Sequence, residues 1–194
     1  MNASSGNSGR LTSVPNLISG LRLAAVPPFV WLFVTGRENP AVLLYGAAAA
    51  TDFLDGYIAR RTGAITELGK LLDPLADRVF VVALTVALSA RGTLPPRLAV
   101  ALVARDALVV SVWPVLERRG VPRIPVSRLG KTATALLLVG LTALATSETT
   151  FSLAHAGRAI GLASTLAGAI AYWAAAVGYA QEARLRLRWR GAAP

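Results

Sequence analysis

The sequence contains no cysteine and is short of charged residues. Only 15% of its 194 residues are charged, whereas 54% are hydrophobic. Without cysteine the chain can form neither disulfides nor thiolate metal sites. A soluble domain typically has about a quarter charged residues, so the shortage of charge disfavours a soluble all-helical bundle, which is the competing interpretation. Several apolar runs of about 17 or more residues can each cross about 30 Å of hydrocarbon. The composition therefore predicts a membrane protein.

The sequence also lacks a cleavable signal peptide and an internal repeat. Residues 1–10 (MNASSGNSGR) are small and polar and lack the apolar core of a cleavable signal. We expect them to be disordered, and we expect the first membrane span to serve as its own insertion signal. The chain also shows no internal repeat, which disfavours a transporter built from duplicated halves.

The apolar segments predict an all-α, polytopic membrane protein. Loops rich in Gly, Pro, Ser and Thr separate six predicted transmembrane helices, at about residues 21–34, 41–58, 71–90, 98–116, 132–145 and 160–180. Polar and apolar residues alternate at a loosely helical spacing over residues 11–23, which predicts a short N-terminal interfacial helix. The alternative is that these residues begin the first span. Together the elements form one membrane domain over residues 11–183.

The basic residues predict how the chain is oriented. Eighteen Arg and two Lys against ten acidic residues give a net charge of +10. Nucleic-acid binding is one interpretation of this excess. With six spans and both termini on one side, however, fourteen basic residues fall on that side and four on the other. The positive-inside rule makes the first side cytoplasmic, so we expect no nucleic-acid partner. The basic cytoplasmic tail, residues 184–194, suits anionic lipid head groups.

Four of the five aspartates lie close together in the sequence. Asp52 and Asp55 are three residues apart, and Asp73 and Asp77 are four apart. On helices, each pair faces one way. A short connection joins the two helices, which are therefore expected to be antiparallel neighbours with both pairs at the cytoplasmic face. The spacing thus predicts that four carboxylates converge on one pocket.

Such convergence needs positive charge at its centre. An aspartate near mid-bilayer costs about 2.5–3.5 kcal/mol, and mutual repulsion adds to the cost. Arginines could compensate in a purely structural network, but Arg78 directly follows Asp77 and adjacent side chains on a helix do not face each other. Carboxylate oxygens are hard ligands that suit Mg²⁺, Mn²⁺ or Ca²⁺. Gly56, beside Asp55, favours close approach of a ligand or another helix.

These residues form a recognisable pattern. The two segments read Asp52-x-x-Asp55-Gly56-x-x-Ala59-Arg60 and, eight residues later, Gly69-x-x-x-Asp73-x-x-x-Asp77. The pattern resembles the signature of the CDP-alcohol phosphatidyltransferases at all eight positions. The segment PNLISGLRL before the first span and the six-span layout are also similar to that family.

The resemblance implies a reaction and a set of roles. The family transfers a phosphatidyl group from CDP-diacylglycerol to an alcohol and releases CMP. By resemblance, Asp52, Asp55 and Asp73 bind two divalent ions, Mg²⁺ or Mn²⁺, with help from Asp77, which also serves as the general base. The resemblance further implies that the CDP-diacylglycerol site includes the small residues and the arginine of the signature, namely Gly56, Ala59, Arg60 and Gly69.

The acceptor alcohol is less well defined. The segments ARDALVVSVWPVLERRG and RIPVSRLGKTAT look similar to the glycerophospholipid branch, which comprises phosphatidylglycerophosphate synthases and cardiolipin synthases. Arg105, Arg128 and Lys131 are candidates for binding an acceptor phosphate; for Arg128 and Lys131 the alternative is a positive-inside loop. We favour glycerol 3-phosphate as the acceptor, with phosphatidylglycerol as the alternative.

Two other protein classes also place aspartates in membranes. Intramembrane prenyltransferases do so, but they are larger and lack the Gly56-x-x-Ala59-Arg60 segment. A divalent-cation transporter would place carboxylates near mid-bilayer rather than at a cytoplasmic hairpin.

Assembly and location are two further expectations. By resemblance we expect a homodimer. Abundant Arg and Ala beside scarce Lys are typical of GC-rich bacterial genomes, which predicts a bacterial plasma membrane location.

Overall fold

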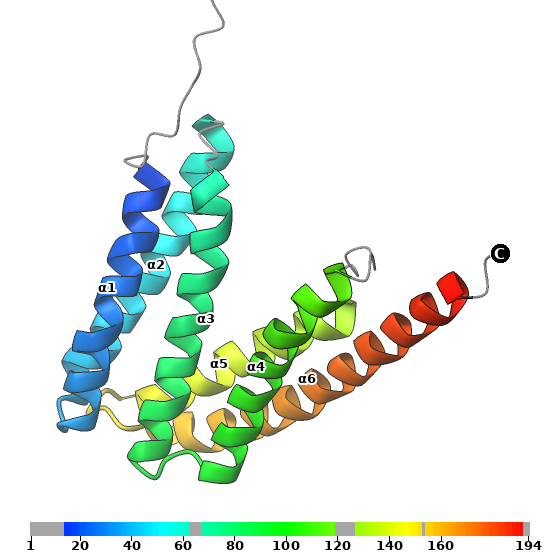
Figure 1. Ribbon diagram of the computed structural model, residues 1–194. Coiled ribbons are helices and arrows are strands. Elements are labelled where there is room, and N and C mark those ends of the chain that lie inside the picture. The colour runs from blue at the N-terminus through cyan, green and yellow to red at the C-terminus, as the bar shows by residue number, and fades with distance from the viewer. Residues whose placement is uncertain (1–13, 63–66, 119–126, 153, 192–194) are drawn as a thin grey trace, which may run out of the picture. The chain divides into compact units, whose positions relative to one another are not determined.

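The computed structural model describes residues 14–62, 67–118, 127–152 and 154–191. These residues form six α-helices: α1 Val14–Val34, α2 Glu38–Thr62, α3 Glu67–Ala90, α4 Pro96–Arg118, α5 Arg128–Ser147 and α6 Ala154–Gly191 (Figure 1). Each predicted span falls within one of these helices, so the all-α prediction is confirmed. The predicted disordered segment, residues 1–10, lies outside the described residues.

The prediction of a separate interfacial helix is wrong for the part of the segment that the structure describes. Residues 14–23 are the first turns of the continuous helix α1. Pro15 occupies the first turn, where a helix needs no backbone donor, so it begins the helix rather than dividing it. The alternative, that this segment starts the first span, is the one observed. The described part of the basic tail, residues 184–191, belongs to helix α6.

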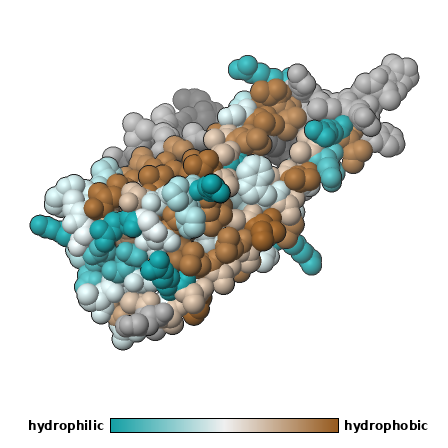
Figure 2. All heavy atoms as spheres, turned by 90° about the horizontal axis from the view of Figure 1, so that it is seen from below, coloured by the Kyte–Doolittle hydropathy of each residue, from teal (hydrophilic) through white to brown (hydrophobic). Residues whose placement is uncertain are grey.

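Three of the described helical segments are long and apolar enough to cross a membrane. They are Pro96–Arg118, Arg128–Ser147 and Ala156–Arg186, and a shorter apolar helix covers Ile18–Val34. Large apolar side chains such as Val110 and Ile170 are more than half exposed, and Figure 2 shows broad apolar areas on the face that it draws. Water would penalise this exposure, whereas lipid chains would not. Six spans remain a prediction.

The chain divides into two compact units, Met1–Ala87 and Leu88–Pro194. In the first unit, α1, α2 and the greater part of α3 lie side by side (Figure 1). Each contributes one ring to an aromatic cluster of Phe29, Tyr45 and Phe80, whose ring centroids are 5.4–6.1 Å apart. Tilted rings at this spacing are a favourable aromatic arrangement. The aromatic cluster therefore holds the three helices in register.

The second unit depends on close contact between α5 and α6. Gly140 on α5 faces Gly161 and Thr165 on α6, and a Cβ added at Gly140 would lie 2.6 Å from the Thr165 backbone nitrogen. Small residues allow helix backbones to approach closely, which is a common way to pack helices in membranes. Helix α4 joins this pair through Leu102, which packs in one cluster with residues of α5 and α6, namely Ala133, Leu137, Ala169 and Tyr172.

A polar contact closes one end of the second unit. The Thr93 hydroxyl in the α3–α4 connection donates a 2.7 Å hydrogen bond to Glu148, which follows α5. The Arg91 guanidinium lies 3.8 Å from the same carboxylate. Because Leu94, next to Thr93, is fully buried, this contact fixes the connection against the end of α5.

The α5–α6 contact predicts different effects for two glycine substitutions. Gly140→Ala would press a methyl group against the α6 backbone, so we expect it to lower the free energy of unfolding by about 1–3 kcal/mol. A Cβ added at Gly178 on α6 would have no neighbouring atom within 4 Å, so Gly178→Ala should be neutral or stabilising by up to about 1 kcal/mol. Thermal unfolding midpoints of both variants, measured in one detergent, check this. Equal midpoints would contradict the close contact.

Candidate active site

The predicted signature residues lie on two helices of the first unit. Helix α2 carries Asp52, Asp55, Gly56, Ala59 and Arg60, and helix α3 carries Gly69, Asp73 and Asp77. Both segments are helical, as the predicted pairing of the carboxylates requires. Among these residues, the structure describes the side chain of Asp77. The pocket formed by all four carboxylates therefore stays a prediction.

The aromatic cluster shows which parts of the three helices share one level. Helices α1 and α3 run in one direction and α2 in the opposite one (Figure 1). Each helix has one residue of interest seven positions from its ring in the cluster, which is about 10 Å along the helix axis. These residues are Arg22 on α1, Asp52 on α2 and Asp73 on α3. Asp77 lies about one turn nearer the cluster on α3. The helix register thus places both halves of the signature at one end of the unit, together with Arg22.

Arg22 makes direct contact with the signature. Its Nη1 donates a hydrogen bond of 2.9 Å to Oδ1 of Asp77, and its side chain is 3% exposed while that of Asp77 is 54% exposed. Arg22 is one of the fourteen basic residues predicted on the cytoplasmic side and lies in the segment PNLISGLRL, but no local spacing connects it with the aspartates. One signal was available, since Arg22 is the only charged residue in the otherwise apolar segment of residues 14–34.

The residue types of the signature fit divalent cations. Four carboxylates on two neighbouring helices provide oxygen ligands of the kind that Mg²⁺ and Mn²⁺ prefer. The Asp77 side chain is half exposed. Among the side chains that the structure describes, no three His, Cys, Asp or Glu residues are grouped to hold a metal ion; the other three aspartates of the signature lie outside that set.

A second buried cation lies in α4. The Arg105 guanidinium sits 3.7 Å from the centroid of the Tyr172 ring on α6. Its Nη1 is 3.4 Å from Oδ1 of Asp106, and the Tyr172 hydroxyl donates a 2.5 Å hydrogen bond to the same oxygen. The Arg105 Nε is buried without a hydrogen-bond partner in the structure. Arg105 and Asp106 are adjacent on α4, yet their side chains come into contact because the arginine side chain is long. Tyr172 of α6 contacts both of them, the guanidinium with its ring and the carboxylate with its hydroxyl.

Comparisons with known proteins identify the family. The family model described as CDP-alcohol phosphatidyltransferase matches residues 12–180. The chain belongs to this family. It is therefore an enzyme of phospholipid synthesis and an integral membrane protein. Membership in the CDP-alcohol phosphatidyltransferase family decides against the prenyltransferase and cation-transporter interpretations. Members of the family use divalent metal ions.

Individual relatives of two kinds are similar to the chain. A cardiolipin synthase (CMP-forming) of Streptomyces coelicolor is 35% identical over 185 residues, which cover 92% of this chain and 86% of the relative. A putative cardiolipin synthase of Mycobacterium tuberculosis is 33% identical over 182 residues, with the same coverage of 92% and 86%. A CDP-diacylglycerol–glycerol-3-phosphate 3-phosphatidyltransferase of Rickettsia typhi is 32% identical over 137 residues, covering 69% of this chain and 76% of the relative.

The three predicted acceptor-binding residues of this phosphatidyltransferase occupy different environments. Arg105 is buried, whereas Arg128 and Lys131, in the first turn of α5, are exposed. Ser127 caps that turn, because its hydroxyl accepts a 3.1 Å hydrogen bond from the Gly130 backbone nitrogen. The structure therefore divides the predicted acceptor residues into one exposed pair that is open to a ligand and one buried cation that already has partners.

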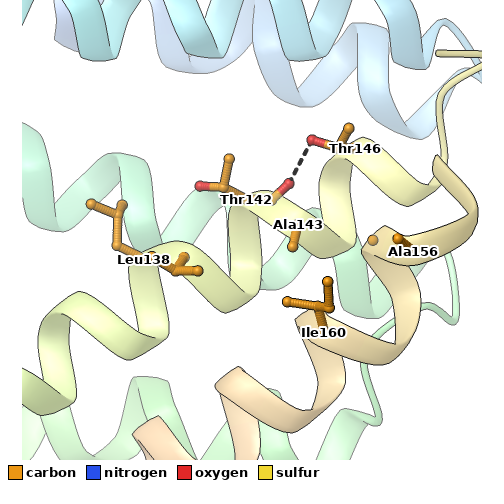
Figure 3. Close-up of a pocket in the computed structure, with 8 residues that line it drawn as sticks. Leu138, Thr142, Ala143, Thr146, Ala156 and Ile160 are labelled. Carbon is orange, nitrogen blue, oxygen red and sulfur yellow. Dashed lines mark hydrogen bonds between the residues drawn. The ribbon is translucent and has the colours of Figure 1, made fainter. Parts of the chain in front are cut away.

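A groove in the second unit is chemically unsuited to phosphatidyl transfer. It has a volume of about 490 Å³ and lies between α5 and α6, where it is lined by Leu138, Val139, Thr142, Ala143, Thr146, Ala156, Gly157 and Ile160 (Figure 3). The Thr146 hydroxyl turns back to the Thr142 carbonyl oxygen at 2.9 Å. The groove has no charged lining residue, so it offers neither metal ligands nor phosphate-binding cations.

The contacts of Tyr172 predict a stability difference between two substitutions. Tyr172→Phe removes the hydrogen bond to Asp106 and keeps the ring beside Arg105, so we expect it to lower the free energy of unfolding by about 1–3 kcal/mol. Tyr172→Leu also removes the ring and should cost more. Thermal unfolding of both variants in detergent measures the two effects. A Tyr172→Phe variant as stable as the parent protein would contradict the role of this hydroxyl.

Proposed function

We propose that the enzyme is a cardiolipin synthase that transfers a phosphatidyl group from CDP-diacylglycerol to phosphatidylglycerol and releases CMP. The similarity to cardiolipin synthases over 92% of the chain carries this proposal, together with the aspartates on α2 and α3. Our sequence analysis favoured glycerol 3-phosphate and named phosphatidylglycerol as the alternative. The comparisons favour that alternative.

The reaction exchanges one phosphorus–oxygen bond for another. The acceptor hydroxyl oxygen forms a bond to the phosphatidyl phosphorus, and the bond from this phosphorus to the oxygen of the departing CMP breaks. In the proposal, Asp77 accepts the hydroxyl proton as general base. Its half-exposed side chain, which accepts a hydrogen bond from Arg22, supports this role because a base needs both access and a defined orientation.

The residues of the signature together bind CDP-diacylglycerol. Asp52, Asp55, Asp73 and Asp77 would hold two divalent ions, Mg²⁺ or Mn²⁺, which when bound neutralise pyrophosphate charge. Gly56, Ala59 and Gly69 would leave room for the cytidine diphosphate group, and Arg60 would contact phosphate. The lipid chains of both substrates then stay in the bilayer while CMP leaves to water.

The acceptor site requires cations for the phosphate of phosphatidylglycerol. We assign this role to Arg128 and Lys131, whose exposure at the start of α5 supports ligand access. Arg105 stays in the proposal because its buried Nε lacks a partner in the structure. The positive-inside distribution of charge supports six spans with the active site on the cytoplasmic side, and the abundance of Arg and Ala beside scarce Lys supports a bacterial plasma membrane. We also propose that the enzyme is a homodimer.

Phosphatidylglycerophosphate synthesis is the second candidate function. The Rickettsia typhi relative, named as a glycerol-3-phosphate phosphatidyltransferase, supports this candidate at 32% identity over 69% of the chain. Both acceptors present a glycerol hydroxyl and a phosphate, so the same basic residues suit either of them.

A direct assay distinguishes the two acceptors. Purified enzyme is given CDP-diacylglycerol, Mn²⁺ or Mg²⁺, and either phosphatidylglycerol or glycerol 3-phosphate, and the lipid products are separated. We expect CMP release and cardiolipin with phosphatidylglycerol, and at least about tenfold slower turnover with glycerol 3-phosphate, equivalent to about 1.4 kcal/mol of discrimination. The reverse preference would establish the second candidate instead.

A substitution at the proposed base tests the mechanism. Asp77→Asn keeps the size of the side chain but removes its charge, so we expect CMP release to fall by at least about 100-fold. Excess chelator should abolish CMP release by the parent enzyme, and added Mn²⁺ should restore it. Turnover at the parent rate in Asp77→Asn would show that Asp77 is not the general base. Turnover in excess chelator would show that the reaction does not require metal ions.

A further inference from the structure

We propose that Arg22 of α1 is a positioning residue for the transfer reaction, because it fixes the orientation of the Asp77 carboxylate. This inference rests on the proposed function, in which Asp77 is the general base. Arg22 lies outside the aspartate signature in sequence, and it comes from a different helix than any signature residue. It reaches the signature through tertiary structure alone.

The geometry of the contact suits an orienting role. The Nη1–Oδ1 distance of 2.9 Å is typical of a hydrogen bond between two charged groups. The arginine is almost completely buried and the aspartate is about half exposed. The buried partner has few alternative positions, so it defines the direction in which the exposed partner points.

Helix α1 is anchored on both sides of this contact. Phe29, two turns along α1 from Arg22, packs against Phe80 of α3 with ring centroids 5.4 Å apart. Ser19, three residues before Arg22, is also buried, so one continuous face of α1 packs inward. A guanidinium held by a helix that packs inward both before and after it can orient a carboxylate with more precision than a cation in a loop.

The Arg22–Asp77 contact also pairs two opposite charges. The predicted convergence of four carboxylates would make them repel one another, and burying an arginine without a counter-charge is costly. The Arg22–Asp77 pair reduces both costs. However, a cation beside the site also weakens the attraction between the carboxylates and divalent ions. Arg22 is therefore expected to favour turnover through orientation while it opposes metal binding through charge.

This opposition provides a test that separates positioning from general structural support. We expect Arg22→Gln to lower kcat for CMP release by about 10- to 100-fold, with KM for CDP-diacylglycerol changed by less than about twofold. The same variant should bind Mn²⁺ as tightly as the parent enzyme or up to about tenfold more tightly, because a nearby positive charge is gone. Electron paramagnetic resonance of free Mn²⁺ measures this binding without turnover.

Arg22→Lys is the conservative variant, and it decides the question if Arg22→Gln does not fold. Lysine keeps the charge but loses the fixed, planar arrangement of donors. We expect its kcat to lie between the values for the parent enzyme and Arg22→Gln, with Mn²⁺ binding equal to that of the parent. A parent-like kcat in Arg22→Lys would contradict the orientation role.

Arg37→Gln provides a matched control. Arg37 is an exposed cation that lies over Trp31, 5.4 Å from the ring centroid, and its removal changes the net charge by the same amount. We expect its kcat and Mn²⁺ affinity to equal those of the parent. If kcat, Mn²⁺ affinity and thermal midpoint all fall together in Arg22→Gln, Arg22 is a structural residue and the proposal is wrong.

The experiment also distinguishes failure of this inference from failure of the proposed function. All variants are assayed with the acceptor that the parent enzyme uses, whether or not it is phosphatidylglycerol. An active parent with an inactive Asp77→Asn and a fully active Arg22→Gln would overturn the role of Arg22 alone. A parent that releases no CMP with any acceptor would overturn the proposed function and this inference with it.

Discussion

A charge that is buried in an apolar chain needs a partner, and this constraint organises both units of the enzyme. In the first unit, Arg22 is buried against Asp77. In the second, Arg105 is buried against Asp106 and the ring of Tyr172. Each arrangement joins different helices, α1 to α3 and α4 to α6. Because an unpaired buried charge is far more costly than a paired one, these contacts restrict how the helices of each unit can pack.

The two units meet their packing requirements in different ways. The first unit uses large side chains, since the aromatic cluster fills the space between α1, α2 and α3. The second unit uses glycines for its closest contact, because Gly140 and Gly161 bring the backbones of α5 and α6 together. The aromatic rings set the axial register of α1, α2 and α3, and the glycines set the distance between α5 and α6. Both arrangements suit a membrane, where van der Waals contact rather than water exclusion drives helix association.

Much of the fold and part of the candidate site could be predicted from the sequence. Apolar runs predict helices because their length matches the hydrocarbon thickness, and each predicted span falls on one observed helix. The pairs Asp52–Asp55 and Asp73–Asp77 lie on helices as their spacing requires. The interfacial helix over residues 11–23 was wrong where the structure describes it, because a proline in a first turn is compatible with a continuous helix. The contact between Arg22 and Asp77 is not predictable in this way, since a charge near the end of a span also fits the positive-inside rule.

The sequence by itself determined the helical class, the aspartate signature and the family, because these depend on residue types at local spacings along one chain. Only the tertiary structure decided which side chains meet across helices. Arg22 and Asp77 are 55 residues apart in the sequence and 2.9 Å apart in space, and Tyr172 meets Asp106 across 66 residues. Such pairs depend on the rotation and register of each helix about its axis. Packing sets these two quantities, through rings in one unit and glycines in the other, and no local spacing specifies them.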